Sequence, residues 1–161
     1  MSPLLKFVRR VHIDAPPDEV FAFHEHPDAL RQLIPPWENM RPVESDGSLT
    51  VGSRVVLAGR VLKFVPVRWV AVHTEYDPPR LFADRQESGP FAYWYHRHRV
   101  EADGGGALLI DEVDYELPLG GMGRWFGDWL VRRQLEAMFA YRHETTKRVV
   151  EAGRMERAGQ P

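Results

Sequence analysis

Residue types alternate with a period of two between residues 93 and 117, which predicts two neighbouring β-strands. Residues 93–101 and 107–117 are separated by Ala102, Asp103 and three consecutive glycines. Successive side chains of a strand point to opposite faces. One face of the pair would carry Trp94, His96, His98, Val100, Leu109, Asp111, Val113 and Tyr115. The other would carry Tyr95, Arg97, Arg99, Glu101, Ile110, Glu112, Asp114 and Glu116. Arginines opposite carboxylates suit solvent, so the aromatic and histidine face is predicted to point inward.

The rest of the chain predicts strands, two short helices and one long helix. Strands are expected at residues 4–13, 41–44, 53–64, 67–76 and 81–87, with short helices after Asp14 and over residues 28–34. A long helix is predicted from about residue 124 to residue 152, because no proline or glycine lies between Asp128 and Ala152. Its apolar stripe consists of Val131, Leu135, Met138, Phe139, Arg142, Thr146 and Val149. Residues 1–152 are predicted to form a single domain, and residues 153–161 a polar tail.

The start of the long helix differs from the rest, because it is apolar on nearly all sides. Trp125, Phe126 and Trp129 are predicted to touch a loop, a partner chain in a homodimer, or a bound apolar molecule. Glycines at positions 120, 121 and 123 precede them. Since each interior glycine costs about 1 kcal/mol relative to alanine, this segment is expected to be mobile and to act as a gate.

Composition narrows the possible classes of function. The chain of 161 residues carries a formal net charge of −2 and contains no cysteine. This balance gives no reason to expect nucleic-acid binding, and the lack of cysteine excludes disulfides, thiolate nucleophiles and cysteine-ligated metals. No run reaches the length of a membrane-spanning helix, and charged residues interrupt the apolar N-terminus. No membrane insertion and a cytoplasmic location are therefore expected.

Several local motifs occur in an order that resembles a known superfamily. They are the segment 15–21, the segment 78–84, Gly89-Pro90-Phe91 followed by Trp94-x-His96-x-His98, and the three glycines followed by Asp111-x-Val113-x-Tyr115-x-Leu117-Pro118. Together with the order of elements, they resemble the SRPBCC or START-like superfamily, in its bacterial polyketide cyclase/dehydrase-like ligand-binding branch. The resemblance implies an α+β helix-grip fold, with a curved antiparallel sheet wrapped around the long helix and a cavity between them. It implies no shared catalytic motif.

On this architecture the inward face of the strand pair would line the cavity. The expected ligand-binding residues are Phe82, Asp84, Gln86, Trp94, His96, His98, Asp111, Val113, Tyr115, Trp125, Phe126 and Trp129. The polar members would form one end of the cavity and the aromatic start of the long helix the other.

The histidine and aspartate cluster is open to three interpretations. Two imidazoles and a carboxylate are a known metal-ligand set, but with two histidines on the face and no thiolate we expect no bound metal and no cofactor. Alternatively, Asp111 fixes the tautomer of His96 or His98, and the trio acts as an acid–base group. The third interpretation is a hydrogen-bonded wall that is structural or recognises a ligand. The histidines at positions 12, 24, 26 and 73 are expected at the surface or at helix ends.

The preferred hypothesis is a protein that binds an apolar or aromatic small molecule, such as a polyketide-, lipid- or sterol-like compound. The first alternative is a cyclase or dehydratase that uses the same cavity. The second is a protein–protein interaction module that docks through the aromatic start of the long helix. The sequence does not establish whether the protein is an enzyme.

Overall fold

The computed structural model describes residues 4–61, 64–118 and 120–159, with the backbone alone described at residues 61 and 120–126. The strands are β1 (Leu5–Ile13), β2 (Met40–Ser45), β3 (Arg54–Val61), β4 (Val65–Asp77), β5 (Leu81–Ser88), β6 (Tyr93–Asp103) and β7 (Gly106–Glu116). The helices are α1 (Pro17–Glu25), α2 (Ala29–Leu33) and α3 (Gly120–Ala158). The expected α+β helix-grip fold is confirmed.

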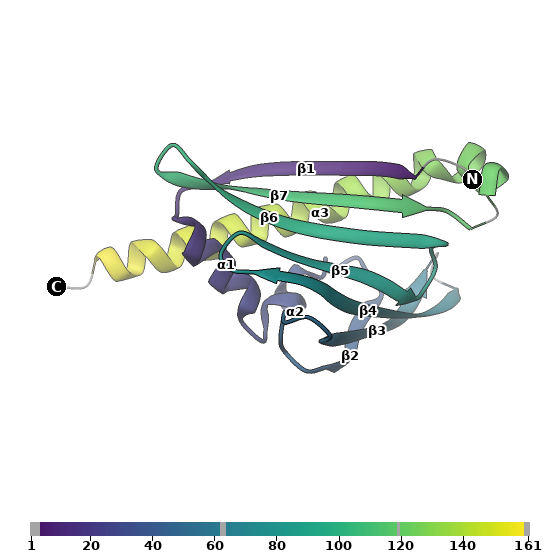
Figure 1. Ribbon diagram of the computed structural model, residues 1–161, viewed down its shortest axis with the longest axis horizontal. Helices are drawn as coiled ribbons and strands as arrows, with labels where there is room; N and C mark the ends of the chain where they lie inside the picture. Colours follow the sequence, from purple (N-terminus) through teal and green to yellow (C-terminus); the bar gives the residue numbers. More distant parts are fainter. Residues whose placement is uncertain (1–3, 62–63, 119, 160–161) are drawn as a thin grey trace.

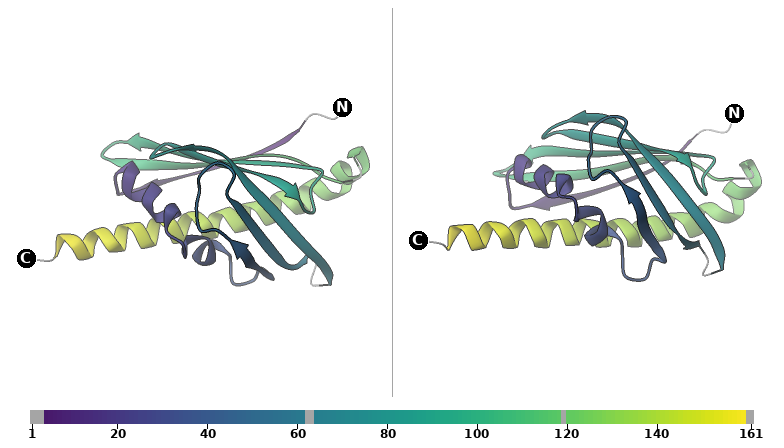
Figure 2. Two further views of the ribbon diagram at one scale, coloured as in Figure 1. Left: turned by 60° about the horizontal axis from the view of Figure 1, so that its bottom comes forward. Right: turned by 90° about the horizontal axis from the view of Figure 1, so that it is seen from below.

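The strands form one antiparallel sheet in the order β1-β7-β6-β5-β4-β3-β2. Strands that follow one another from β2 to β7 are neighbours, and β1 closes the sheet on the far side of β7. The chain crosses from β1 to β2 through α1 and α2, as Figure 1 shows. The sheet curves around α3, and α1 and α2 lie on the same side of it as α3 (Figure 2). All three helices therefore cover the same face of the sheet.

The sequence accounts for the ends of the short helices. Pro17 occupies the first position of α1, where a proline loses no helical hydrogen bond, and Asp18 and Glu19 lie in the first turn, where the helix dipole favours negative charge. α1 ends at Glu25, shortly before Pro27, and α2 ends before Pro35 and Pro36. The two breaks turn the chain from β1 toward the far edge of the sheet.

The turn between β6 and β7 explains the three consecutive glycines. Asp103 and Gly106 form the last pair of the hairpin, and the two residues between them have positive φ values, 56° for Gly104 and 91° for Gly105. A two-residue hairpin turn of this kind requires positive φ at both central positions, which glycine adopts without strain. The turn therefore fixes the register of the strand pair.

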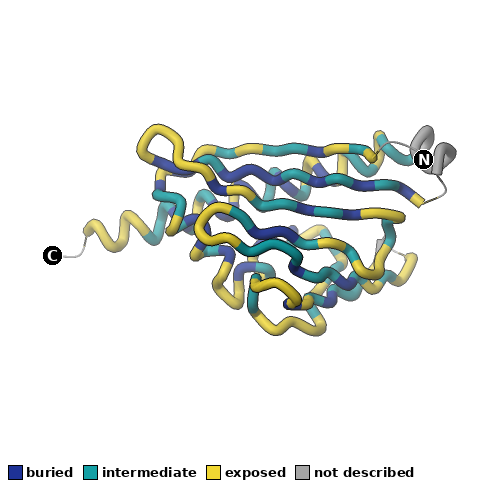
Figure 3. The backbone as a smooth tube through the Cα atoms, in the orientation of Figure 1, coloured by how far each residue is buried: buried dark blue, intermediate teal, exposed yellow. Residues whose placement is uncertain are grey.

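The core consists of two clusters of buried side chains. One joins β1, β5, β6 and β7 to α1 and contains Ile13, Val20, Phe21, Phe82, Val100 and Leu109. The other joins β1, β6 and β7 to α3 and contains Phe7, Trp94, Val113, Tyr115, Leu135 and Phe139. Figure 3 shows this burial as dark segments along the central strands. Burying one such side chain contributes about 1.5–3 kcal/mol.

The long helix extends beyond both predicted ends, and two expectations are corrected. Its backbone is already helical at Gly120, so α3 begins within the glycine-rich segment and not near residue 124 as expected. The predicted tail continues as helix to Ala158. Arg154 donates a hydrogen bond to the carbonyl oxygen of Asp14 at 2.8 Å, and Arg157 forms an ion pair with Glu19 at 2.5 Å. These contacts with the start of α1 hold the extra turns.

No helix in the described parts of the chain is both long and apolar enough to cross a membrane.

Candidate functional site

The site begins with the inward face of β6 and β7, and the predicted register of this pair is confirmed. Trp94 pairs with Tyr115, His96 with Val113 and His98 with Asp111. His96 is 3% exposed and Asp111 is 2% exposed. On the opposite face the side chain of Arg97 keeps 35% of its surface exposed and forms an ion pair with Asp114 at 3.0 Å. The alternation therefore separates a buried polar cluster from a solvated ladder of charges.

Asp111 is the centre of the buried cluster. His96 donates from Nε2 to Oδ1 of Asp111 at 2.8 Å, and His143 donates from Nε2 to Oδ2 at 2.5 Å. Nδ1 of His98 also lies 2.7 Å from Oδ1 of Asp111, but the angle at this contact does not meet that of a hydrogen bond. The interaction between His98 and Asp111 is therefore mainly electrostatic. A buried carboxylate must have such partners, because an unpaired charge away from water is costly.

His143 is the member of the cluster that the sequence interpretation missed. It lies on α3, one helical turn after Phe139 and three residues before Thr146, and both of these are fully buried. That spacing placed His143 beside the predicted apolar stripe. Only the docking of α3 against β7 brings it to Asp111, and this docking is a tertiary feature that no local pattern in the sequence reveals.

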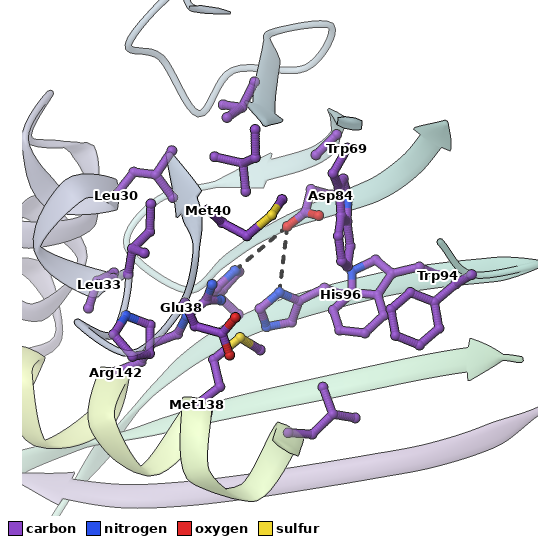
Figure 4. A pocket seen from close by; sticks show the side chains of 18 of the residues that line it. Leu30, Leu33, Glu38, Met40, Trp69, Asp84, Trp94, His96, Met138 and Arg142 are labelled. Atoms are coloured by element: carbon purple, nitrogen blue, oxygen red, sulfur yellow. Dashed lines mark ion pairs between the residues drawn. The ribbon is translucent and has the colours of Figure 1, made fainter. Parts of the chain in front are cut away.

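Asp84 on β5 approaches the same two histidines from the other side. Its Oδ2 atom lies 3.6 Å from Nδ1 of His96 and 3.8 Å from Nε2 of His98. Figure 4 shows Asp84 facing His96, with Arg142 and Glu38 beside them. His96 and His98 therefore lie between two carboxylates, Asp111 behind them and Asp84 in front.

The charges of the cluster follow from these contacts. Burial alone would raise the pKa of Asp111, but the charge of His98 and the hydrogen bonds from His143 and His96 outweigh burial and hold the pKa well below its usual range. Burial lowers the pKa of His96, and the neighbouring His98 lowers it further. Burial also acts to lower the pKa of His98, but Asp111 and Asp84 outweigh it and raise that pKa. Asp111 is thus ionised, His96 is neutral, and His98 is the group that holds a proton more readily.

A cavity of about 600 Å³ lies between the sheet, α2 and α3, and the histidine cluster faces it. Its polar end is formed by His24, His73, Asp84, His96, His98 and Arg142. Its apolar walls include Leu30, Leu33, Val55, Leu57, Trp69, Trp94, Leu135 and Met138. Figure 4 shows leucine and methionine side chains on one side of Asp84 and tryptophans on the other. The cavity is therefore amphipathic, with largely apolar walls and a cluster of ionisable groups on β5 and β6.

The residues expected to line the cavity divide into three groups. Phe82, Asp84, Trp94, His96 and His98 do line it. Gln86, Asp111, Val113, Tyr115 and Trp129 do not. The side chains of Trp125 and Phe126 lie outside the described residues.

The residues away from the cavity have other contacts. Gln86 closes the turn after β5, where its amide donates to the carbonyl oxygen of Phe91 at 2.8 Å. Asp111 supports the histidines from behind, Val113 is core, and Tyr115 is buried with its hydroxyl donating to Asp128 at 2.8 Å. Trp129 is 70% exposed and packs against Arg133. Among the described residues at the start of α3, Gly127, Leu130 and Val131 line the cavity, whereas Trp129 does not.

Two further histidines, His24 and His73, were expected at the surface or at helix ends. His24 does lie in the last turn of α1, but His73 lies within β4 and neither is at the surface. His24 and His73 are both 8% exposed and line the cavity. His24 donates from Nδ1 to the carbonyl oxygen of Val20 at 2.9 Å, which holds its ring against α1. Burial, together with the nearby His98, lowers the pKa of His24 to about 4. The buried Nδ1 of His73 has no hydrogen-bond partner among the described residues.

A curved antiparallel sheet wrapped around a long C-terminal helix, with a cavity between them, defines the helix-grip class of proteins. The chain belongs to the SRPBCC-type family described as polyketide cyclase / dehydrase and lipid transport, whose model matches residues 5–151. No curated protein matches the chain in sequence.

Solved structures show the same fold at low sequence identity. An aromatase/cyclase from Streptomyces sp. R1128 is 20% identical with a TM-score of 0.70, covering 98% of this chain and 99% of that one. A point mutant of norcoclaurine synthase from Thalictrum flavum is 15% identical with a TM-score of 0.69, covering 96% and 99%. A nucleoside-diphosphate sugar epimerase from Corynebacterium glutamicum is 22% identical with a TM-score of 0.72, covering 90% of this chain and 29% of that one. The family and the fold together support a ligand-binding or cyclase role.

Proposed function

We propose that the protein binds an apolar or aromatic small molecule of polyketide-, lipid- or sterol-like chemistry in the cavity between the sheet and α3. The observation that carries this proposal is the cavity itself. Its volume of about 600 Å³ falls within the range of small-molecule sites, about 300–1,000 Å³. The family description names lipid transport, which is consistent with such a ligand.

The distribution of side chains gives the ligand an orientation. Its apolar body would pack against Leu135 and Met138 of α3 and against the paired rings of Trp69 and Trp94, whose centroids are 5.0 Å apart. A carbonyl or hydroxyl group would point toward Asp84 and His98. Polar groups at one end fix the orientation of a ligand, whereas the apolar contacts contribute most of the affinity.

Native mass spectrometry of freshly purified protein tests this proposal. Ala71 lines the cavity, so Ala71→Trp would fill it, whereas Ala137 is exposed on α3 and Ala137→Trp is the matched control. We expect the wild type and Ala137→Trp to carry or take up an apolar compound such as a long-chain fatty acid, and a folded Ala71→Trp variant to carry none. Equal occupancy in all three proteins would place the ligand elsewhere and contradict the proposal.

A second candidate, a cyclase or dehydratase acting on a polyketide-like substrate, is favoured by the geometry of the histidines. His96 and His98 line an open cavity and are both in contact with Asp111, an arrangement that orients an imidazole to take up or release a proton. Either histidine would remove a proton next to a substrate carbonyl, and Asp111 would stabilise the resulting imidazolium. The solved aromatase/cyclase with this fold is consistent with such chemistry.

The two candidates differ in what His98→Gln does. In a binding protein the variant would only change affinity for the compound. In an enzyme that uses His98 as the base, it would abolish conversion of a polyketide-like substrate while the substrate still binds, and His96→Gln would do so if His96 is the base. Product formation measures the conversion.

A further inference from the structure

Three potential ligand atoms converge at the polar end of the cavity, on two adjacent strands. They are a nitrogen of His96, a nitrogen of His98 and a carboxylate oxygen of Asp84, and all three lie within 4.8 Å of one another. Two imidazoles and one carboxylate form a ligand set that suits a divalent transition metal. Asp84, His96 and His98 also line the cavity, so an ion from solution has a path to them.

Hydrogen bonding determines which nitrogen of His96 faces Asp84. An ionised carboxylate only accepts hydrogen bonds, so His96 must carry its proton on Nε2, the atom 2.8 Å from Asp111. The neutral ring then directs the lone pair of Nδ1 toward Oδ2 of Asp84, 3.6 Å away. Both atoms are electron-rich, and the distance exceeds that of a hydrogen bond. A positive charge placed between them would relieve this repulsion.

His98 repeats the arrangement with its nitrogens exchanged. Its Nδ1 lies 2.7 Å from Asp111, which leaves Nε2 toward Asp84 at 3.8 Å. Ligand atoms that bind a tetrahedral ion at about 2.1 Å lie about 3.4 Å apart. The two distances to Asp84 are therefore only a few tenths of an ångström too long. The two histidine nitrogens lie within 4.8 Å of each other, so side-chain rotations that bind an ion must also bring these nitrogens closer together.

The surroundings resemble the outer shell of a metal site. Metal-binding histidines commonly donate their second nitrogen to a carboxylate, which fixes the ring and raises its basicity as a ligand. Asp111 provides this hydrogen bond for His96 at 2.8 Å, lies 2.7 Å from Nδ1 of His98, and is itself held by His143 at 2.5 Å. The carboxylates of Asp84, Asp111 and Glu38 face one permanent cation, Arg142, in this part of the cavity. A divalent ion bound beside them would offset the excess of negative charge.

We propose that Asp84, His96 and His98 bind one divalent transition-metal ion, of the Zn²⁺, Co²⁺ or Fe²⁺ type, at the polar end of the cavity. This replaces the expectation from the sequence that no metal is bound, which counted two histidines on the face and assigned no metal-binding role to the carboxylate on β5. The remaining coordination positions of the ion face the cavity. There the ion would bind and polarise a carbonyl or hydroxyl oxygen of a bound molecule. The site depends on the protein's own side chains and does not require the proposed apolar ligand.

Titration of chelator-treated protein with Co²⁺ alone tests the proposal, by calorimetry and by the visible absorption of the bound ion. We expect one Co²⁺ per chain, displaced by Zn²⁺. Asp84→Asn and His98→Gln should each weaken binding by more than the 10–100-fold typical of outer-shell changes, and Asp111→Asn by about 10–100-fold. His26→Gln is the control, because His26 lines the cavity but lies outside the cluster, and it should leave binding unchanged.

Asp84→Asn decides the question if Asp111→Asn fails to fold, because Asp84 makes no contact at hydrogen-bond length with either histidine. No binding by the wild type, or equal Co²⁺ affinity of the wild type and folded Asp84→Asn, would overturn the proposal. Uptake of an apolar compound by the Asp84→Asn variant, measured separately, shows whether the proposed ligand-binding function stands without the metal site.

Discussion

The two faces of the β6–β7 hairpin carry similar charged groups in opposite environments. On the outer face Arg97 and Asp114 form an ion pair at 3.0 Å, with their side chains 35% and 24% exposed. On the inner face Asp111 meets His96 and His143 at 2.8 Å and 2.5 Å, and all three side chains are at most 4% exposed. Water screens the outer pair, whereas the inner groups depend on one another. The ion pair on the outer face therefore contributes little to stability. The cluster on the inner face is costly to disturb, and its side chains are available for function.

The largest expected effect is that of Asp111→Asn. The amide keeps the shape of the side chain, but it is neutral and offers only one acceptor oxygen to two donating histidines. We expect the free energy of unfolding, measured by urea denaturation, to fall by about 3 kcal/mol. A loss below about 1 kcal/mol would show that the buried cluster behaves like a surface pair.

His143→Leu tests whether the histidine from α3 belongs to the cluster. Leucine has no donor, so the change removes the hydrogen bond to Oδ2 of Asp111, and bonds to charged groups contribute about 1.5–3 kcal/mol. We expect a loss of about 2 kcal/mol in the same urea measurement. The matched control is His26→Leu, which should change stability by less than about 0.5 kcal/mol because His26 is exposed. Equal effects of the two changes would place His143 outside the network.

Asp114→Asn is the matched variant of Asp111→Asn on the outer face of the hairpin. Because the pair with Arg97 is partly exposed, the expected loss is less than about 1 kcal/mol. High salt should reduce this loss further, since screening weakens exposed pairs far more than buried ones. A salt-independent loss as large as that of Asp111→Asn would remove the contrast between the faces.

The smallest expected effect is that of Trp129→Ala. This side chain is 70% exposed and does not line the cavity, so stability should change by no more than about 0.5 kcal/mol and uptake of an apolar compound should be unchanged. Binding that weakens by about 1 kcal/mol or more would show that Trp129 closes over the ligand, as its position at the apolar start of the long helix first suggested.

The contrast between the faces was predictable from the sequence, because a period of two and the matching of arginines with carboxylates leave a single register. His96, His98 and Asp111 were therefore placed together correctly. His143, His24 and His73 were not assigned to the site, because their positions depend on how α3, α1 and β4 pack against the central strands. Such packing brings together residues that are up to about 120 positions apart, and no local period encodes it.

The contacts made by the aromatic start of the long helix, in contrast, could not be predicted from the sequence. Its residues are apolar on every side, and a helical pattern without a polar face does not say which side meets the protein. In the structure Leu130 and Val131 line the cavity, whereas Trp129 packs against Arg133. Hydrophobicity alone therefore predicted a contact surface at this turn but not which of its residues would line the cavity.

Tryptophan fluorescence with a brominated long-chain fatty acid tests the central claim, that the cavity holds an apolar molecule, most directly. Bromine quenches tryptophans that it approaches closely, and Trp69 and Trp94 line the cavity, whereas Trp37 is 58% exposed and does not. We expect saturable quenching in the wild type and in Trp37→Phe, and its loss in the double variant Trp69→Phe, Trp94→Phe. Quenching that persists unchanged in the double variant, or that does not saturate in the wild type, would contradict binding in this cavity.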